Sequence, residues 1–270
     1  MSRSALFGRF LELGLPTHDI AASVQFYERL GFRQLLTGDA WPHRYGVLGD
    51  GRIHLALHEQ PAQPGPRGAG QGAAVPDCLA PIFVLPGLAG ALAALRAAGV
   101  EPQTLHFGDE SLHHLQLLDP GGNVVRLQEA RTFSPAPSES GVHGSLCGYF
   151  LHLSLPQSDF APARAFWERA GWVALPEEET PYPHLPLTAD QLDLAFHARG
   201  GFDAPFLAFE CHDVPGALAR LGELGILPRA QAARGLSVRG SALLAAPEGT
   251  LLWLLPAVQD TERESAQTSA

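Results

Sequence analysis

An internal duplication restricts the fold of this chain more than any other feature of its sequence. Residues 10–19, FLELGLPTHD, match residues 150–159, FLHLSLPQSD, and the register continues from 26–32, FYERLGF, to 166–172, FWERAGW. A duplicated sequence folds into two halves of the same architecture. The length of 270 residues suits two domains, because a single core rarely grows beyond about 250–300 residues.

Each half contains a shorter unit twice. Residues 90–95, GALAAL, recur as 216–221, GALARL, and both halves end with a turn followed by a strand, at 119–128 and 246–255. Within a unit, an alternating strand leads into a helix, and short alternating strands separated by Gly, Pro and Asp turns come after it. The sequence therefore predicts an α+β chain of four βαβββ modules.

The composition of the connecting segments predicts where the domains begin and end. We expect a first domain over residues 1–131 and a second over 148–258, because the segment 132–147 between them is rich in Ser, Pro and Gly. The polar residues 259–270 are expected to form a tail.

Composition also excludes several classes of function. All 18 basic residues are arginine, so the chain lacks the lysine that Schiff-base chemistry and phosphate-binding P-loops require. The net charge of −10 disfavours nucleic acid and anionic membranes as partners, and no apolar run is long enough to span a bilayer. Three widely spaced cysteines and the lack of a secretory signal predict a cytoplasmic protein.

Alternation along the strands separates a core face from an opposite face. Leu13 and Leu15 share the core face, so Glu12 points the other way. The same alternation assigns further polar and aromatic residues to the non-core faces: His54, His114, Gln116 and Arg126 in the first half, and His152, Ser154, Asp193, His197, Glu210 and Trp253 in the second. Such side chains are more typical of a lined pocket than of a solvated sheet face, which is the alternative interpretation.

The motifs at the two ends of the first half resemble one family. The strand–Asp–helix opening with FYERLGF, and the ending DPGGNVVRL at 119–127, are similar to the vicinal oxygen chelate superfamily. That superfamily includes glyoxalase I, extradiol ring-cleavage dioxygenases, fosfomycin-resistance enzymes and bleomycin-binding proteins. The resemblance covers about residues 8–256. It implies that paired βαβββ modules form two glyoxalase-like incomplete barrels, with two sheets per domain around a pocket.

The resemblance also implies where metal ligands would lie, in the first and last strands of each module. Those places hold Glu12, His54, Ala80 and Arg126 in the first half, and His152, Asp193, Phe206 and Trp253 in the second. A facial-triad iron site needs two histidines and a carboxylate, and a zinc or nickel site needs three or four nitrogen or oxygen ligands. Neither half supplies more than two, and the guanidinium of Arg126 would repel a cation.

We therefore expect degenerate metal sites without a bound cofactor. In the first half, Glu12 would pair with Arg126. In the second, His152 would bond to Asp193 above an aromatic floor. Two alternatives retain a divalent metal (Zn, Ni, Fe or Mn). The first and third modules could face each other and bring together Glu12, His54, His152 and Asp193, or His114 could complete a poorer site.

These expectations give a functional hypothesis and its alternatives. The chain is expected to be a glyoxalase- or bleomycin-resistance-like protein, a monomer or homodimer, that binds a small organic ligand in its barrels. The residues expected to contact that ligand are His54, His114, Arg126, His152, Asp193 and Trp253. The alternative is a metal-dependent lyase or extradiol-type dioxygenase that uses Glu12 and His54, or His152 and Asp193, with Glu12 as ligand or catalytic base. A third hypothesis makes one domain a structural remnant.

Three smaller features have structural explanations. His58 and His197 end equivalent strands, where a structural hydrogen bond is expected. His43 and His184 follow proline in matching loops, which predicts a structural turn. The cysteines lack any nucleophile motif.

Overall fold

The computed structural model describes residues 6–40, 43–60, 78–108, 111–130, 144–200, 202–229 and 238–257. In the first half the elements are β1 (Arg9–Thr17), α1 (Ile20–Arg29), β2 (Arg33–Ala40), β3 (His43–Gly49), β4 (His54–Glu59), β5 (Ala80–Leu85), α2 (Leu88–Ala97), β6 (Thr104–Gly108), β7 (Ser111–Leu118) and β8 (Val124–Glu129). In the second half they are β9 (Tyr149–Gln157), α3 (Phe160–Ala170), β10 (Val173–Ala174), β11 (Leu185–Thr188), β12 (Leu194–Ala198), β13 (Phe206–Cys211), α4 (Val214–Glu223), β14 (Ala242–Ala245) and β15 (Leu251–Pro256).

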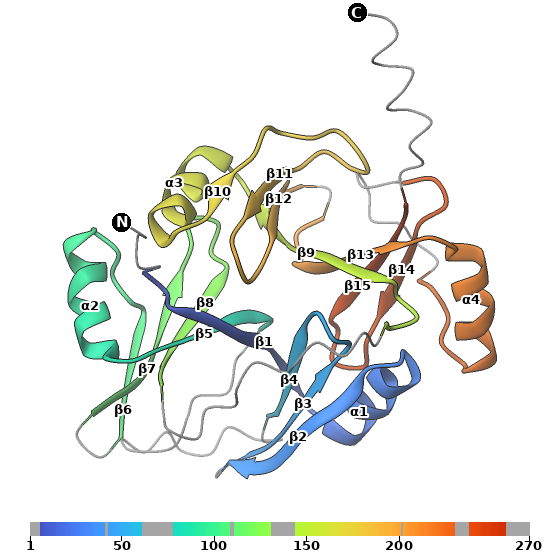
Figure 1. Cartoon of the computed structure of the whole chain (residues 1–270), viewed down its shortest axis with the longest axis horizontal. Coiled ribbons are helices and arrows are strands. Elements are labelled where there is room, and N and C mark those ends of the chain that lie inside the picture. The colour runs from blue at the N-terminus through green and yellow to red at the C-terminus, as the bar shows by residue number, and fades with distance from the viewer. Residues whose placement is uncertain are drawn as a thin grey trace, which may run out of the picture.

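The described strands form two mixed sheets, one in each half (Figure 1). The first has eight strands in the order β2-β3-β4-β1-β5-β8-β7-β6, and the second has seven in the order β10-β11-β12-β9-β13-β15-β14. This arrangement confirms the predicted α+β fold of βαβββ modules.

The pairing of modules differs in one respect from the expectation. β1 and β5 are hydrogen-bonded to each other and so are β9 and β13, so each half forms one continuous sheet rather than two. The first module therefore pairs with the second, and the third with the fourth. The alternative site of Glu12, His54, His152 and Asp193 was wrong, because these residues come from two different halves and, among the described residues, no three potential ligands group around a metal position.

Aspartates at equivalent positions of the two repeats cap the first helix of each half. The side chains of Asp19 and Asp159 accept hydrogen bonds from the backbone N–H groups of Ala22 and Ala161, at 3.0 and 2.9 Å. Such a cap stabilises a helix by about 1 kcal/mol. Gly171 ends α3 with a φ of +116°, a left-handed conformation that favours glycine.

A single hydrophobic core joins the two halves. Phe7 of the first half lies with its ring centroid 5.9 Å from those of Phe166 and Trp167. Cys147, which composition assigns to the linker, is buried in this core. Residues 132–143 of that linker and the tail 259–270 lie outside the described residues.

The turn that ends each half contacts the first helical region of the other half. The carboxylate of Asp119 accepts hydrogen bonds from Gln157 Nε2 at 2.6 Å and from Trp167 Nε1 at 3.3 Å. The carboxylate of Glu248 accepts one from the Tyr27 hydroxyl at 2.6 Å. In Figure 1, α1 accordingly lies near the strand pair β14–β15, and α3 near β8.

Each described helix is too short or too polar to cross a membrane.

Candidate functional site

The side chains that the sequence places away from the core occupy one face of the first sheet. Leu13, Leu115 and Leu127 belong to the shared core, so the residues that alternate with them point the other way. We call this face the first non-core face. Its functional side chains are Glu12, His54, Ile82, His106, His114, Gln116 and Arg126.

Strand pairing brings three of these residues into one row. Glu12 of β1 lies opposite Ile82 of β5, and Ile82 lies opposite Arg126 of β8. Paired residues point to the same side of a sheet, and neighbouring strands lie about 4.8 Å apart. His54 extends the row on β4, where it directly precedes the first residue paired with β1.

Glu12 is a partly buried carboxyl group that forms no ion pair with any side chain in the described part of the chain. The surrounding protein raises its pKa to about 7, and burial is the one cause of that shift. The predicted ion pair between Glu12 and Arg126 was therefore wrong. Their strands are two apart, and Ile82 stands between them. A carboxyl group with such a pKa gains and loses its proton near neutral pH.

His54 is held by the backbone rather than by Glu12. Burial lowers the pKa of the His54 imidazole, and a hydrogen bond to the backbone of Leu11 partly opposes this effect. The ring also lies against Gly49, where a Cβ atom would approach His54 Cδ2 to 3.0 Å. One side of the ring is thus fixed by the main chain.

Arg126 and two histidines form the other end of the face. His106 and His114 stack with ring centroids 4.6 Å apart and an interplanar angle of 12°. Burial is the main cause that lowers the pKa of His114 to about 3, and the neighbouring Arg126 lowers it further. Both histidines are therefore neutral at pH 7, while Arg126 keeps its charge although only 2% of it is exposed.

The second half holds a different arrangement, a chain of buried hydrogen bonds. His152 Nε2 lies 2.6 Å from the Tyr182 hydroxyl, which is 3.1 Å from Ser154 Oγ. Ser154 Oγ lies 2.8 Å from His197 Nδ1, and His197 Nε2 lies 3.1 Å from the carbonyl oxygen of Phe202. We call these groups the second-half network. Each polar side chain in it has a partner.

This network corrects one prediction and confirms another. The expected hydrogen bond between His152 and Asp193 was wrong, because His152 bonds to Tyr182 while Asp193 is exposed. The expected strand-end hydrogen bond of His197 is confirmed.

Aromatic side chains fill the space around the network. Tyr182, Phe206 and Trp253 are at most 5% exposed, and the ring centroid of Trp253 lies 5.1 Å from that of Tyr182 and 5.3 Å from that of Phe206. The predicted aromatic floor of Phe206 and Trp253 is therefore present. The indole N–H of Trp253 donates to Ser241 Oγ at 3.0 Å.

Strand register also tests the places at which the family would put metal ligands. In the first sheet Ile82, not Ala80, lies in the row of Glu12 and Arg126. In the second sheet Ala208, not Phe206, lies in the row of His152 and Trp253. The two weaker placements in the sequence were thus off by two residues.

The donor atoms in these rows do not fit a divalent metal. The first row offers a carboxyl and an imidazole beside an isoleucine and an arginine, and the second offers a single buried imidazole beside an alanine and a tryptophan. Across the described ranges, no three His, Cys, Asp or Glu side chains are grouped so that they could hold a metal ion.

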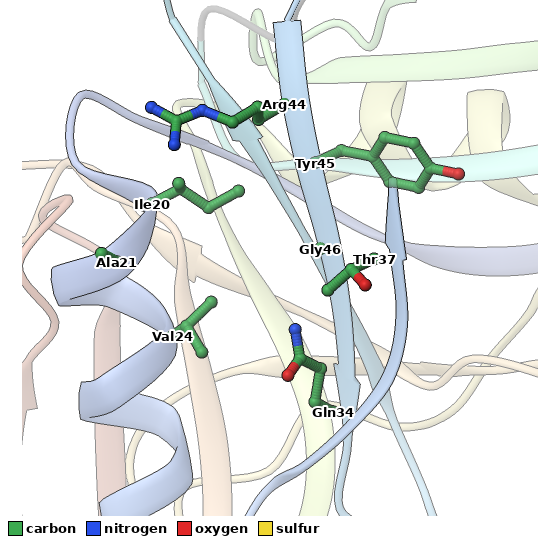
Figure 2. Close-up of a pocket in the computed structure, with 8 residues that line it drawn as sticks. All are labelled: Ile20, Ala21, Val24, Gln34, Thr37, Arg44, Tyr45 and Gly46. Carbon is green, nitrogen blue, oxygen red and sulfur yellow. The ribbon is translucent and has the colours of Figure 1, made fainter. Parts of the chain in front are cut away.

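A separate hollow of about 340 Å³ lies between α1 and the β2–β3 hairpin. Figure 2 shows Ile20 and Val24 of α1 facing it, with Arg44 at its rim. Arg44 forms an exposed ion pair with Glu59 at 2.8 Å. The Tyr45 ring points away from this hollow (Figure 2). It stacks on the His58 ring, with the two ring centroids 6.4 Å apart.

Sequence reasoning missed two residues, Tyr182 and His106. Tyr182 occurs in the repeated aromatic–Pro–His segment, which predicted only a structural turn at the histidine. His184 is buried and bonds through Nδ1 to the carbonyl oxygen of Tyr182 at 2.7 Å, which agrees with a structural turn. The side chain of His43 lies outside the described residues. His106 lies opposite His114 in the β6–β7 hairpin, a pairing that the sequence does not reveal.

The fold is similar to that of extradiol ring-cleaving enzymes of known structure. A catechol 2,3-dioxygenase is 18% identical with a TM-score of 0.56, and the match covers 94% of this chain and 91% of that one. Homoprotocatechuate 2,3-dioxygenase from Arthrobacter globiformis is 17% identical with a TM-score of 0.58, covering 94% and 81%. At these identities the likeness establishes the fold alone. Curated proteins provide no match to this chain.

A family model matches the sequence directly. Residues 9–127, from the first strand of the first sheet almost to the end of β8, match the model described as Glyoxalase/Bleomycin resistance protein/Dioxygenase superfamily. The first half of the chain thus matches the glyoxalase/bleomycin resistance protein/dioxygenase superfamily, and the second half repeats the architecture of the matched part.

Proposed function

We propose that this protein binds a small organic ligand on the first non-core face without the help of a metal. The observation that supports this function is the contrast between the two halves. On the first face, Glu12 and His54 remain partly accessible beside the buried side chains of Ile82 and Arg126. In the second half, aromatic side chains cover the equivalent row.

The contrast assigns different roles to the predicted ligand-contacting residues. His54, His114 and Arg126 belong to the proposed binding face. His152 and Trp253 stabilise the second domain from within, and Asp193 is exposed at its surface. In this proposal the second domain acts as a structural partner, in line with the third hypothesis from the sequence.

Nuclear magnetic resonance of the full chain tests the proposal. The protein is first dialysed against a chelator, and phenol, benzamide, benzylamine and benzoate are then added singly while backbone amide signals are followed. We expect the signals of Glu12, Ile82 and Arg126 to shift, and those of Ser154 and Gln34 to stay. Shifts confined to the second-half network, or to the hollow beside α1, would contradict the proposal.

A second candidate function is proton transfer by Glu12, and its pKa of about 7 favours it. A base of this pKa removes a proton next to a carbonyl most efficiently near neutral pH. The test measures exchange of the methyl protons of acetophenone for deuterium in the chelator-treated protein. Exchange that is lost in Glu12→Gln supports this activity, and exchange equal to that of buffer argues against it.

A further inference from the structure

The hollow between α1 and the β2–β3 hairpin has the size of a binding site for a small molecule. Its volume of about 340 Å³ lies within the usual range of such pockets, about 300–1,000 Å³. Since a cavity of about 150 Å³ already holds benzene, the hollow has room for a body of about two rings, and a single-ring molecule would fill roughly half of it.

The second half shows that this fold does not require the hollow. Gly46 of β3 pairs with Leu57 of β4 in the first half, and Leu185 of β11 pairs with Phe196 of β12 in the second. The two pairs are equivalent, because Leu57 and Phe196 occupy matching places beside the duplicated first strands. Leu185 is 4% exposed and belongs to the hydrophobic core. A glycine therefore stands in the first half where the second half packs a leucine.

The backbone at position 46 does not demand a glycine. The φ angle of Gly46 lies outside the left-handed region. A Cβ atom on Gly46 would lie 3.9 Å from Val24 Cγ2 and 3.9 Å from the carbonyl oxygen of Leu36, which is ordinary van der Waals contact. Glycine inside a strand often marks a place where a ligand approaches the backbone closely. The space beside Gly46 is thus open although a side chain could fill it.

The residues around the hollow favour an uncharged ligand. Ile20 and Val24 of α1 form an apolar wall, and the amide of Gln34 points toward Val24 (Figure 2). An amide can both donate and accept a hydrogen bond. Among the described lining residues Arg44 carries the one charge, and its Nε and Nη2 donate to the carboxylate oxygens of Glu59 at 2.8 and 3.1 Å. This ion pair has no net charge, so a charged ligand would find little compensation here.

We propose that the hollow beside α1 binds an uncharged amphiphile of about two rings. Its apolar body packs on Ile20 and Val24, and its polar group forms a hydrogen bond with the amide of Gln34. The site is independent of the first non-core face, because Gly46 pairs with Leu57, whose side chain belongs to the core on the other side of the sheet.

Fluorescence titration of the full chain tests the proposal with two dyes of the same skeleton, uncharged N-phenylnaphthylamine and its charged counterpart anilinonaphthalene sulfonate. The uncharged dye should bind about tenfold more tightly or better, because burying a charge without a partner is unfavourable. Gly46→Leu, which introduces the side chain found at Leu185, should weaken binding of the uncharged dye by about tenfold or more. Gly46→Ala should weaken it less. Leu227→Ser is the control for unspecific binding, since it removes an apolar side chain that is 75% exposed, and it should leave the affinity unchanged.

Nuclear magnetic resonance of the unaltered protein guards against a variant that fails to fold. The side-chain amide signals of Gln34 and the methyl signals of Val24 should shift with the uncharged dye, while the backbone signal of Glu12 should stay. Unchanged affinity in Gly46→Leu, tighter binding of the sulfonate, or no binding of the uncharged dye would each overturn the proposal. None of these results bears on the first non-core face, which the single-ring molecules test separately.

Discussion

Replacing Tyr182 by phenylalanine removes a single hydroxyl group from the middle of the second-half network. The direction of each hydrogen bond follows from one end, because the Phe202 carbonyl oxygen can only accept. Neutral His197 must then carry its proton on Nε2 and accept at Nδ1, so Ser154 donates to it. Ser154 in turn accepts from Tyr182, and Tyr182 accepts from His152 Nε2–H.

The direction of these hydrogen bonds determines how much unfolding free energy each variant loses. Tyr182→Phe leaves the buried N–H of His152 without an acceptor, which costs about 1–3 kcal/mol of unfolding free energy. Ser154→Ala removes the hydrogen-bond partner of two groups, the Tyr182 hydroxyl and His197 Nδ1, and should therefore lower the unfolding free energy by more. The double variant should cost less than the sum by about 0.5–1.5 kcal/mol, because both changes break the same hydrogen bond.

Urea unfolding followed by circular dichroism measures these differences. Tyr149→Phe is the control, since the Tyr149 ring is 47% exposed and stacks under Arg52, so its loss of a hydroxyl should change stability by less than about 0.5 kcal/mol. If Tyr182→Phe were no more destabilising than Tyr149→Phe, the reasoning would fail. A nitrogen-15 spectrum that placed the His197 proton on Nδ1 would refute the assigned direction.

Three further predictions concern titration and packing. Several buried histidines have a pKa of about 3 or 4 in the folded chain: His114, His152 and His197. They bind protons in the unfolded chain below pH 6.5, whereas Glu12, with a pKa of about 7, binds one in the folded chain below pH 7. The net difference of about two protons predicts that urea unfolding will show stability falling by about 2–3 kcal/mol per pH unit from pH 6.5 toward 4.5. A flat profile over that range would contradict these pKa values. Glu12→Gln should stabilise the chain by up to about 3 kcal/mol at pH 8, where Glu12 is ionised at a cost, and should have little effect at pH 5; equal effects at both pH values would count against a buried carboxyl. Asp119→Ala should lower the stability by about 2–4 kcal/mol in thermal unfolding, since it leaves the buried donors of Gln157 and Trp167 unpaired, while Asp159→Ala, which removes only a helix cap, should cost about 1 kcal/mol.

The fold was predictable because its signals are local and repeated. The duplication and the alternating strands identify the modules, and the matched segments that end in Asp19 and Asp159 lead into equivalent helices. The pairing of β1 with β5 was not predictable, since hydrogen bonds between distant strands leave no periodic mark on a sequence.

The candidate site was predictable as a set of faces but not as a set of contacts. Alternation placed Glu12 and Arg126 on one side of their sheet, yet their separation depends on a register that brings Ile82 between them. Tyr182 enters the second domain from a loop, where no strand period applies. A residue that reaches its partner from a loop can be found only once the tertiary structure is known.

The reciprocal contacts of the two terminal turns have a consequence for assembly. The Asp119 turn closes on α3 of the other half, and the Glu248 turn closes on α1, so each half supplies the surface that the other requires. The peptide link between the halves raises their local concentration. Residues 1–140 and 141–270, produced as separate polypeptides, should therefore recombine into a heterodimer with the shape of the intact chain.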